Sequence, residues 1–349
     1  MTTTDVQTDT LLKAKKPLHP ALLRFVEKEH LTPEQIAALQ AEVRQLAKER
    51  NAVILAHNYQ VPEIQDVADF VGDSLGLAFE AAKVQADVIV LCGVYFMAET
   101  AKILNMERTI LIPDTDAGCS LADSIDVEQL RAWKARHPGA VVVSYVNTTA
   151  DIKAESDYCV TSGNALAVVN SIPKDKKILF LPDIYLGEWI RHTTGRENME
   201  IWAGECHVHA GIRVSEIDAN MKANPDADLL IHPECGCTSR YVWAAGTGRL
   251  PADKTHVLST EGMVRHAKNS PVQKHIVATE TGILHRLQKE NPYKDFVPAD
   301  AGAECVFMKK ITLTKLRDCL RDMQPQVELD PEIAAKAKLA IDRMMAVPR

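Results

Sequence analysis

Three cysteines occupy equivalent positions in a threefold repeat of the sequence. The repeat aligns without gaps over eight residues in each copy: AVILAHNY (Ala52–Tyr59), AVVVSYVN (Ala140–Asn147) and ADLLIHPE (Ala227–Glu234). Downstream, Cys119 and Cys206 are 87 residues apart, and Cys305 follows after 99, so the third copy has 12 additional residues. Three equivalent thiols can converge on one axis, which indicates a metal or cluster site rather than scattered core cysteines.

The number and spacing of these thiols favour a particular kind of site. Structural zinc usually takes four ligands, often in C-x2-C pairs, and electron-transfer clusters usually take four cysteines. Cys119, Cys206 and Cys305 therefore predict a 4Fe–4S cluster with three protein ligands and one open iron. An open iron can act as a Lewis acid on a substrate hydroxyl or carboxylate.

The other cysteines offer one competing ligand set. The segment Cys235–Cys237 stands close to His232 and Glu234 and could bind metal or form a disulfide, although the other two copies have no counterpart of it. The remaining cysteines are expected in the core or on a helix face: Cys92, Cys159 and Cys319.

Polar residues stand at or just beyond the end of the aligned strand in each copy. They are His57, Asn58, Tyr59, Tyr145, Asn147, His232 and Glu234. A single histidine or tyrosine there would usually serve the structure, but seven such residues in three equivalent places indicate a reaction site. Histidine, tyrosine and glutamate are the usual general acid–base groups.

A serine or threonine precedes an apolar helical pattern in each copy, at Ser74, at Ser162 and at Ser259–Thr260. These residues are expected to cap helices. A helix N-terminus also attracts anions. Three of them around one centre would suit a substrate with several carboxylates or a phosphate.

The elements around these residues alternate between strand and helix. Thr32 and Gln35 predict a capping box at the start of a first helix. In each copy a helix leads into the aligned strand, and a second helix leads into a second strand, expected at Val88–Leu91, Ile178–Leu181 and His275–Ala278. A third helix and a short third strand follow. This alternation predicts a parallel sheet covered by helices, with ligands beyond the carboxyl ends of the strands.

The predicted fold class is therefore α/β, with three homologous three-layer α/β domains whose short parallel sheets surround a pseudo-threefold axis. A length of 349 residues suits three small domains. The expected boundaries are an N-terminal arm at 1–31, repeats at 32–118, 119–205 and 206–304, and a helical tail at 305–349 that closes onto the first repeat.

Composition excludes several classes of protein. A net charge of −7 and the lack of a basic stripe argue against nucleic-acid binding. No apolar run reaches the ~18 residues of a membrane span, and the N-terminal residues lack the apolar stretch of a signal peptide. We therefore expect a cytoplasmic protein with no membrane partner, whose eight cysteines do not form structural disulfides.

The sequence resembles the quinolinate synthase family, the iron–sulfur enzymes of bacterial NAD biosynthesis. The resemblance covers roughly residues 32 to 345. It is carried by AHNYQ (56–60), GDSL (72–75), FMAETAKIL (96–104), YVNTTA (145–150), TSGNA (161–165), HPEC (232–235), STEGM (259–263), ATETG (278–282) and ECVFMKKITL (304–313). Other members lack the second cysteine of HPECGC, which argues against an essential role for Cys237.

The resemblance implies a pseudo-threefold fold and a 4Fe–4S cluster on Cys119, Cys206 and Cys305. It also implies a reaction in which iminosuccinate and dihydroxyacetone phosphate condense to quinolinate, phosphate and two waters. An L-aspartate-oxidising enzyme is the implied source of iminosuccinate.

Roles for individual residues follow as hypotheses. Glu234 is the expected general base, and Tyr59 and His57 are expected to transfer protons. The expected substrate contacts are His57, Ser74, Tyr145, Val146, Asn147, Ser162, His232, Pro233, Glu234, Ser259 and Thr260. Two alternatives remain: another cluster- or metal-dependent dehydratase, and a non-enzymatic iron–sulfur redox protein with a fourth protein ligand.

Overall fold

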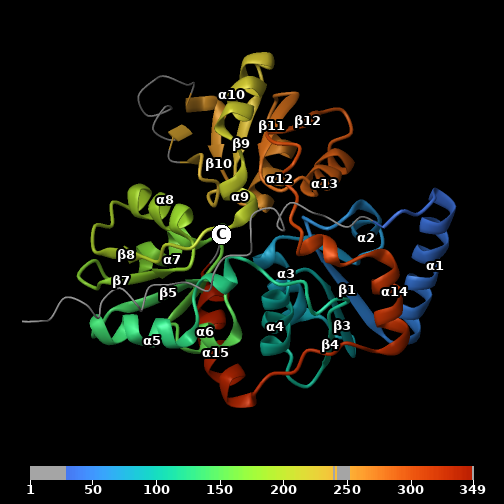
Figure 1. The fold of residues 1–349 in the computed structure, drawn as a ribbon, viewed down its shortest axis with the longest axis horizontal. Coiled ribbons are helices and arrows are strands. Elements are labelled where there is room, and N and C mark those ends of the chain that lie inside the picture. Colours follow the sequence, from blue (N-terminus) through green and yellow to red (C-terminus); the bar gives the residue numbers. More distant parts are fainter. Residues whose placement is uncertain (1–28, 239, 242–251, 348–349) are drawn as a thin grey trace, which may run out of the picture.

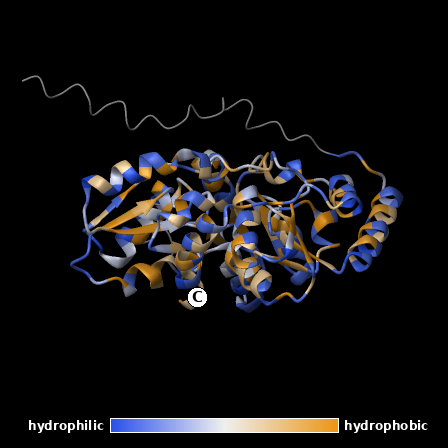
Figure 2. Ribbon diagram, turned by 90° about the horizontal axis from the view of Figure 1, so that it is seen from below, coloured by the Kyte–Doolittle hydropathy of each residue, from blue (hydrophilic) through white to orange (hydrophobic). Residues whose placement is uncertain are grey.

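The computed structural model describes residues 29–238, 240–241 and 252–347. Three four-stranded sheets, each covered by helices, surround a common centre and form a flat, three-lobed molecule (Figure 1). Seen edge-on, the strands are mostly hydrophobic, whereas hydrophilic residues are common on the outer helices (Figure 2). The predicted α/β class with three repeated sheets is confirmed, and most of the expected arm at 1–31 lies outside the described residues.

The three sheets share one topology. The strand orders are β2-β1-β3-β4, β6-β5-β7-β8 and β10-β9-β11-β12, with parallel pairing throughout. The strands of the first sheet are β1 (Ala52–His57), β2 (Phe70–Gly72), β3 (Val88–Cys92) and β4 (Thr109–Leu111). Those of the second are β5 (Val141–Tyr145), β6 (Tyr158–Val160), β7 (Ile178–Leu181) and β8 (Met199–Ile201). Those of the third are β9 (Asp228–Ile231), β10 (Thr255–Val257), β11 (Lys274–Ala278) and β12 (Asp295–Pro298).

The aligned segment of each copy forms a central strand, β1, β5 or β9. These strands are short apolar runs, as expected where helices cover both faces of a parallel sheet. The sequence predicted three strands in each copy, but the structure has four. The missed strands β2, β6 and β10 each have three residues and lie at a sheet edge, too short to show a periodic pattern.

Helices connect and cover the strands. They are α1 (Pro33–Glu49), α2 (Pro62–Gln65), α3 (Ser74–Lys83), α4 (Tyr95–Leu104), α5 (Val127–Arg136), α6 (Ala150–Ala154), α7 (Ala165–Ser171), α8 (Ile184–Thr194), α9 (His207–Gly211), α10 (Val214–Ala223), α12 (Thr260–Asn269), α13 (Ile283–Glu290), α14 (Leu313–Asp322) and α15 (Pro331–Ala346). The capping box predicted at Thr32 and Gln35 is present at the start of α1.

The last two helices pack against different parts of the molecule. Helix α14 lies beside α1, where Arg317 donates to Glu42 at 3.0 Å. Helix α15 packs against α6 and β6 of the second unit and against α4 of the first. The side chain of Asn164 donates to the backbone oxygen of Met344 on α15 at 2.9 Å. Helix α15 therefore bridges the first two units.

None of the helices in the described part of the chain combines the length and apolar character that crossing a bilayer requires. Most of the extra length of the third copy lies between Glu234 and Ser259, since His232 and Ser259 are 27 residues apart whereas the corresponding spacing is 17 in the other two copies. Much of that stretch falls on residues 239 and 242–251, which are outside the described part.

Candidate active site

The carboxyl ends of the three central strands meet at one cavity of about 70 Å³. Most of the residues singled out from the sequence line it: His57, Tyr59, Ser74, Cys119, Tyr145, Asn147, Ser162, Cys206, His232, Glu234, Thr260 and Cys305. The three units therefore contribute to a single site, because parallel strands present their carboxyl ends at one edge of each sheet.

Three predicted contact residues do not line this cavity. Val146 is buried, and its backbone N–H donates to the Val160 oxygen at 2.8 Å. Pro233 is buried in the turn after β9. Ser259 caps α12, since its hydroxyl accepts from the backbone N–H of Gly262 at 3.2 Å. These residues support neighbours that do reach the cavity.

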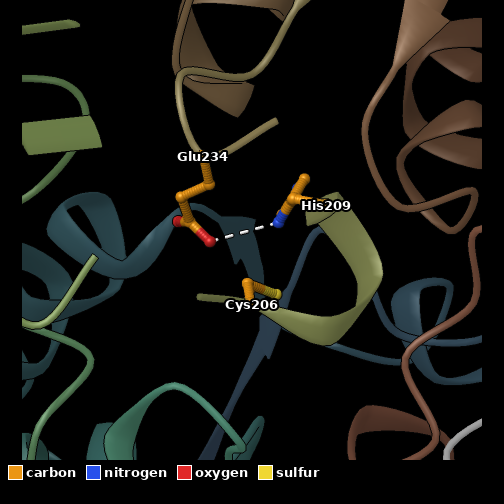
Figure 3. Close-up of side chains that lie close together, drawn as sticks. All are labelled: Cys206, His209 and Glu234. Atoms are coloured by element: carbon orange, nitrogen blue, oxygen red, sulfur yellow. Dashed lines mark ion pairs between the residues drawn. The ribbon is translucent and has the colours of Figure 1, made fainter. Parts of the chain in front are cut away.

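Glu234 is the carboxylate at the centre of the site (Figure 3). It is 3% exposed, and its Oε1 accepts a short hydrogen bond from the Tyr145 hydroxyl. Its Oε2 lies 3.1 Å from Nδ1 of His209. Burial raises the pKa of Glu234, but the neighbouring His209 and His232 and the donors His209 and Tyr145 outweigh burial and lower it. Glu234 is therefore a carboxylate at neutral pH.

Two buried histidines flank this carboxylate without carrying charge. Burial lowers the pKa of both His57 and His232 to about 3. His232 is thus a neutral ring at pH 7, and the neighbouring His209 is the largest influence that lowers the pKa of Glu234, with the Tyr145 hydroxyl as a smaller one. Nε2 of His232 lies 3.2 Å from the Ser162 hydroxyl.

A chain of hydrogen-bonding groups runs from Glu234 to Tyr59. Nε2 of His209 lies 2.8 Å from the Thr279 hydroxyl. That hydroxyl lies 2.6 Å from the Tyr59 hydroxyl, and burial raises the pKa of Tyr59 well above its usual value. The arrangement can move a proton between the carboxylate and the phenol while both remain shielded from water.

The predicted helix caps are only partly right. Asp73 caps α3, accepting from the Gly76 N–H at 2.7 Å, so Ser74 is the first helical residue rather than the cap. Ser162 lies in the turn before α7 and does not cap it. Aspartate is as good a cap as serine, which is why the residue type alone did not decide the position.

The N-termini of α3 and α12 reach the cavity at Ser74 and Thr260. Among the described residues, neither lysine nor arginine lines it. An anionic ligand would therefore be held by hydroxyls, backbone N–H groups and helix dipoles.

The three repeat cysteines share a local structure as well as the cavity. Each thiol accepts backbone N–H bonds from the residues after it, from Leu121 and Ala122, from His209, and from Phe307 and Met308. Burial raises the pKa of Cys119 to about 12 and that of Cys305 to about 11, and each of these pKa values is further raised by a nearby acidic group. Such thiols ionise when a cation compensates their charge, so the donor set fits a metal group.

The separation of the thiols bears on the kind of group. A single tetrahedral ion with bonds of about 2.3 Å needs sulfurs about 3.8 Å apart. Within the described ranges, the ligand groups whose atoms all lie within 4.8 Å include Cys206, His209 and Glu234 (Figure 3), but not the three cysteines together. The three thiols therefore suit a group larger than one ion.

The other cysteines lie apart from the cavity lining. Cys92, Cys159 and Cys319 are buried free thiols, as predicted. Cys235 and Cys237 form a disulfide, with their Cα atoms 5.2 Å apart. This pair takes the disulfide that the sequence offered as an alternative to metal binding, and it departs from the general expectation of reduced cysteines because one intervening glycine leaves the two side chains within bonding reach.

Comparison with known proteins matches residues 41–346 to the family described as "Quinolinate synthetase A protein". The chain belongs to the quinolinate synthase family. It is 55% identical over 307 residues to quinolinate synthase of Mycobacterium sp. (strain KMS), covering 88% of this chain and 91% of the relative. It is 54% identical over 310 residues to quinolinate synthase of Thermus thermophilus, covering 89% of this chain and 97% of the relative. These relatives are enzymes, and so is this member of the family.

A solved structure of the E-1-hydroxy-2-methyl-but-2-enyl-4-diphosphate reductase from Plasmodium falciparum aligns with a TM-score of 0.28 and 11% identity. The alignment covers 75% of this chain and 87% of that chain. A likeness at this level carries no argument.

Sequence reasoning missed several polar residues of this quinolinate synthase family member. His209 follows Cys206 at the C-x-x-H spacing, which was a usable signal. Glu280 is fully buried and lies 2.8 Å from Nζ of Lys309, and it also accepts from the Cys305 N–H at 3.0 Å. Both Glu280 and Lys309 stand in motifs that carried the family resemblance.

Proposed function

We propose that this chain condenses iminosuccinate with dihydroxyacetone phosphate to give quinolinate, phosphate and two waters. The observation that carries the proposal is the convergence of three partly buried cysteines, an ionised Glu234 and two helix N-termini on one cavity, in a member of the quinolinate synthase family. The substrates are anionic and the reaction needs several proton transfers, and both requirements match this lining.

We further propose that Cys119, Cys206 and Cys305 hold a 4Fe–4S cluster. Their backbone N–H bonds suit thiolate ligands, and their wide separation supports a multi-iron group more than a single ion. When bound through three thiolates, the cluster would supply one open iron as a Lewis acid for loss of a hydroxyl group.

Glu234 is the proposed general base, because it is ionised and held in place by two donors. A proton taken by Glu234 can pass through His209 and Thr279 to the Tyr59 oxygen as the hydroxyl of Tyr59 gives its own proton to the substrate. His57 contacts the Tyr59 ring at a centroid distance of 4.5 Å, and its neutral imidazole can take a proton from the substrate and return it in the dehydration steps.

Binding of the substrate falls to the remaining polar groups. Ser74, Ser162 and Thr260 are proposed to hold carboxylate or phosphate oxygens. His232, Tyr145 and Asn147 are proposed to hold the other carboxylate and the developing ring nitrogen. Oδ1 of Asn147 is buried and has no hydrogen-bond partner among the described residues, so it is free to accept an N–H from a ligand.

Iminosuccinate is an imine that water hydrolyses, so it has to be produced close to where it is consumed. We propose an L-aspartate-oxidising enzyme as its source. A site in the cytoplasm, where reduced thiols persist, suits three free cysteine ligands.

The test is product analysis with the anaerobically reconstituted enzyme. Quinolinate and phosphate should appear in equal amounts when both substrates are supplied, and neither should appear when one is left out. Glu234→Gln should lose turnover and keep its iron and sulfide, whereas Glu216→Gln on the exposed face of α10 should match the wild type. Absence of quinolinate from the cluster-loaded wild type would refute the proposed reaction.

The ligand assignment has a separate test. Replacing Cys119, Cys206 or Cys305 singly with alanine should abolish or strongly reduce the iron and acid-labile sulfide that the protein retains. The matched controls are Cys235→Ala and Cys159→Ala, which should keep both. A full cluster in any of the first three variants would remove that cysteine from the ligand set.

A further inference from the structure

A second cluster of metal-ligating side chains lies in the third unit, away from the cavity. Asp228 and His275 stand opposite each other on the paired strands β9 and β11. His256 on β10 pairs with Leu230 on β9. Because Leu230 is two residues after Asp228 on the same strand, the side chains of His256 and Asp228 lie on the same face of the sheet. His266 reaches this face from α12. Asp228 precedes His232 by four residues, about 13 Å of strand, so the cluster lies toward the opposite end of the sheet from the cavity.

The three imidazoles direct the same ring atom at one carboxylate oxygen. Nε2 of His266, His256 and His275 lie 2.8, 3.8 and 4.0 Å from Oδ2 of Asp228. One ligand atom from each of Asp228, His266 and His275 lies within 4.8 Å of the other two, whereas His256 does not belong to this close group. In a tetrahedral site with metal–ligand bonds of about 2.0–2.1 Å, neighbouring ligand atoms are about 3.3 Å apart. The observed separations bracket this value.

Among the described residues, Nε2 of His266 bonds Asp228, but three other ring nitrogens of the cluster have no hydrogen-bond partner. His275 is fully buried, and neither of its ring nitrogens has a hydrogen-bond partner among the described residues. Nε2 of His256 is likewise buried and unpartnered within the described ranges, while the ring bonds the backbone of Asp253. Buried polar groups almost always have partners. Three ring nitrogens here have no hydrogen-bond partner, and two of them, Nε2 of His256 and of His275, face Oδ2 of Asp228. This arrangement points to a missing ligand.

We propose that Asp228, His256, His266 and His275 bind one zinc ion. Imidazole and carboxylate ligands in a tetrahedral set are typical of zinc. The ligands already have supporting contacts of the kind that orient metal ligands, since Ser270 donates to Asp228 at 3.2 Å and the ring of His275 stacks on Phe296. Side chains of His256 and His266 are 25% and 21% exposed, so an ion can enter from solvent.

The role of this zinc is structural. Its ligands come from β9, β10, β11 and α12, so one ion would tie the edge strand and the covering helix to the centre of the third sheet. A set of four protein ligands leaves no open position for chemistry. The proposal does not depend on the proposed reaction or on the iron–sulfur cluster.

Metal analysis of the full-length, cluster-loaded enzyme tests the site. Zinc added and then dialysed should leave one equivalent bound to the wild type, and cobalt in its place should give the visible bands of a tetrahedral nitrogen–oxygen site. Cobalt on cysteine would instead show an intense sulfur charge-transfer band in the near ultraviolet. Zinc should also raise the midpoint of thermal unfolding.

The variants localise the signal. Asp228→Asn and His275→Gln should lose this equivalent and the zinc-dependent rise in melting temperature. His256→Gln, on the edge strand, should fold and bind zinc at least about tenfold more weakly. The matched control is His285→Gln, since His285 also pairs with one carboxylate, Asp66, at 2.9 Å but lacks further histidines around it.

Either of two results would overturn the proposal. One is a wild type that retains no zinc and shows no nitrogen–oxygen cobalt spectrum. The other is zinc affinity in His256→Gln and Asp228→Asn equal to that of His285→Gln, since bound metal would then lie elsewhere.

Discussion

At the residue scale, two neighbouring side chains from different units keep Glu234 ionised. Tyr145 at the end of β5 donates to its carboxylate and His209 on α9 lies 3.1 Å from it, and both lower a pKa that burial raises. A hydrogen bond to a charged group contributes about 1.5–3 kcal/mol. The protonation state of the proposed base therefore depends on side chains outside its own strand.

Tyr145→Phe tests this dependence. Removal of the hydroxyl should raise the pKa of Glu234, so the acid limb of the pH profile of kcat should move toward neutral by about 1 to 2 pH units. The control is Tyr185→Phe, because Tyr185 donates to Glu205 at 3.2 Å at an exposed position. An unmoved acid limb in Tyr145→Phe would show that Glu234 does not set it.

His209→Asn tests the proton path. The variant interrupts the chain between Glu234 and Thr279, so kcat should fall by about 10²- to 10⁴-fold with KM much less affected. Iron content separates the two roles that His209 could have. A variant that keeps its iron and loses turnover supports a proton relay, whereas loss of iron would make His209 a ligand. His192→Asn, on the exposed face of α8, serves as control.

At the scale of elements, helix caps both stabilise the fold and shape the cavity. Ser259 caps α12, whose first residue Thr260 lines the cavity, and Thr312 caps α14, which packs on α1. The two caps use the same chemistry in different places.

Ser259→Ala and Thr312→Ala should each lower the free energy of unfolding by about 1 kcal/mol. Only Ser259→Ala should also raise KM for an anionic substrate, because it loosens the helix N-terminus proposed to hold that substrate. Urea unfolding and steady-state kinetics on the same preparations check both effects. Equal KM values in the two variants would argue against anion binding at α12.

The sequence predicted most of the strands and helices, and it predicted that the polar residues would lie at the carboxyl ends of the strands. It did not predict which side chains contact each other. The repeat predicted the central strands β1, β5 and β9, since apolar runs at a fixed interval carry a strong signal. It could not reveal that His209 would meet Glu234, because the two residues lie 25 positions apart on different elements and meet only after packing. Nor could it separate Asp73 from Ser74 as the cap of α3, since both residue types are good caps.

Buried neutral histidines set the pH dependence of the whole molecule. His57 and His232 have pKa values lowered by burial from 6.5 to about 3. In the unfolded chain these two histidines therefore become protonated near pH 6.5, whereas in the native state they become protonated only near pH 3. The contribution of these two histidines to the free energy of unfolding is fully present above pH 6.5 and is lost as the pH falls toward 3.

The expected slope is about 1.4 kcal/mol per pH unit for each such histidine well below pH 6.5. His57→Gln should reduce the slope by roughly that amount, while the exposed His192→Gln should leave it unchanged. Urea unfolding at a series of pH values between about 4 and 7 measures it, with the pH window given by the two pKa values. A wild type whose stability does not change across this range would contradict the neutral, buried state of both rings.

The position of helix α15 determines when the fold of the first two units can be completed during synthesis. It packs on α4 and α6, yet it is synthesised after every other described element. Its partners in the first two units therefore leave the ribosome with an apolar face that stays uncovered until α15 has emerged. The central cavity is likewise incomplete until the segment that contains Cys305 has been synthesised. A nascent chain stalled in the third unit would hold two folded sheets and no complete site.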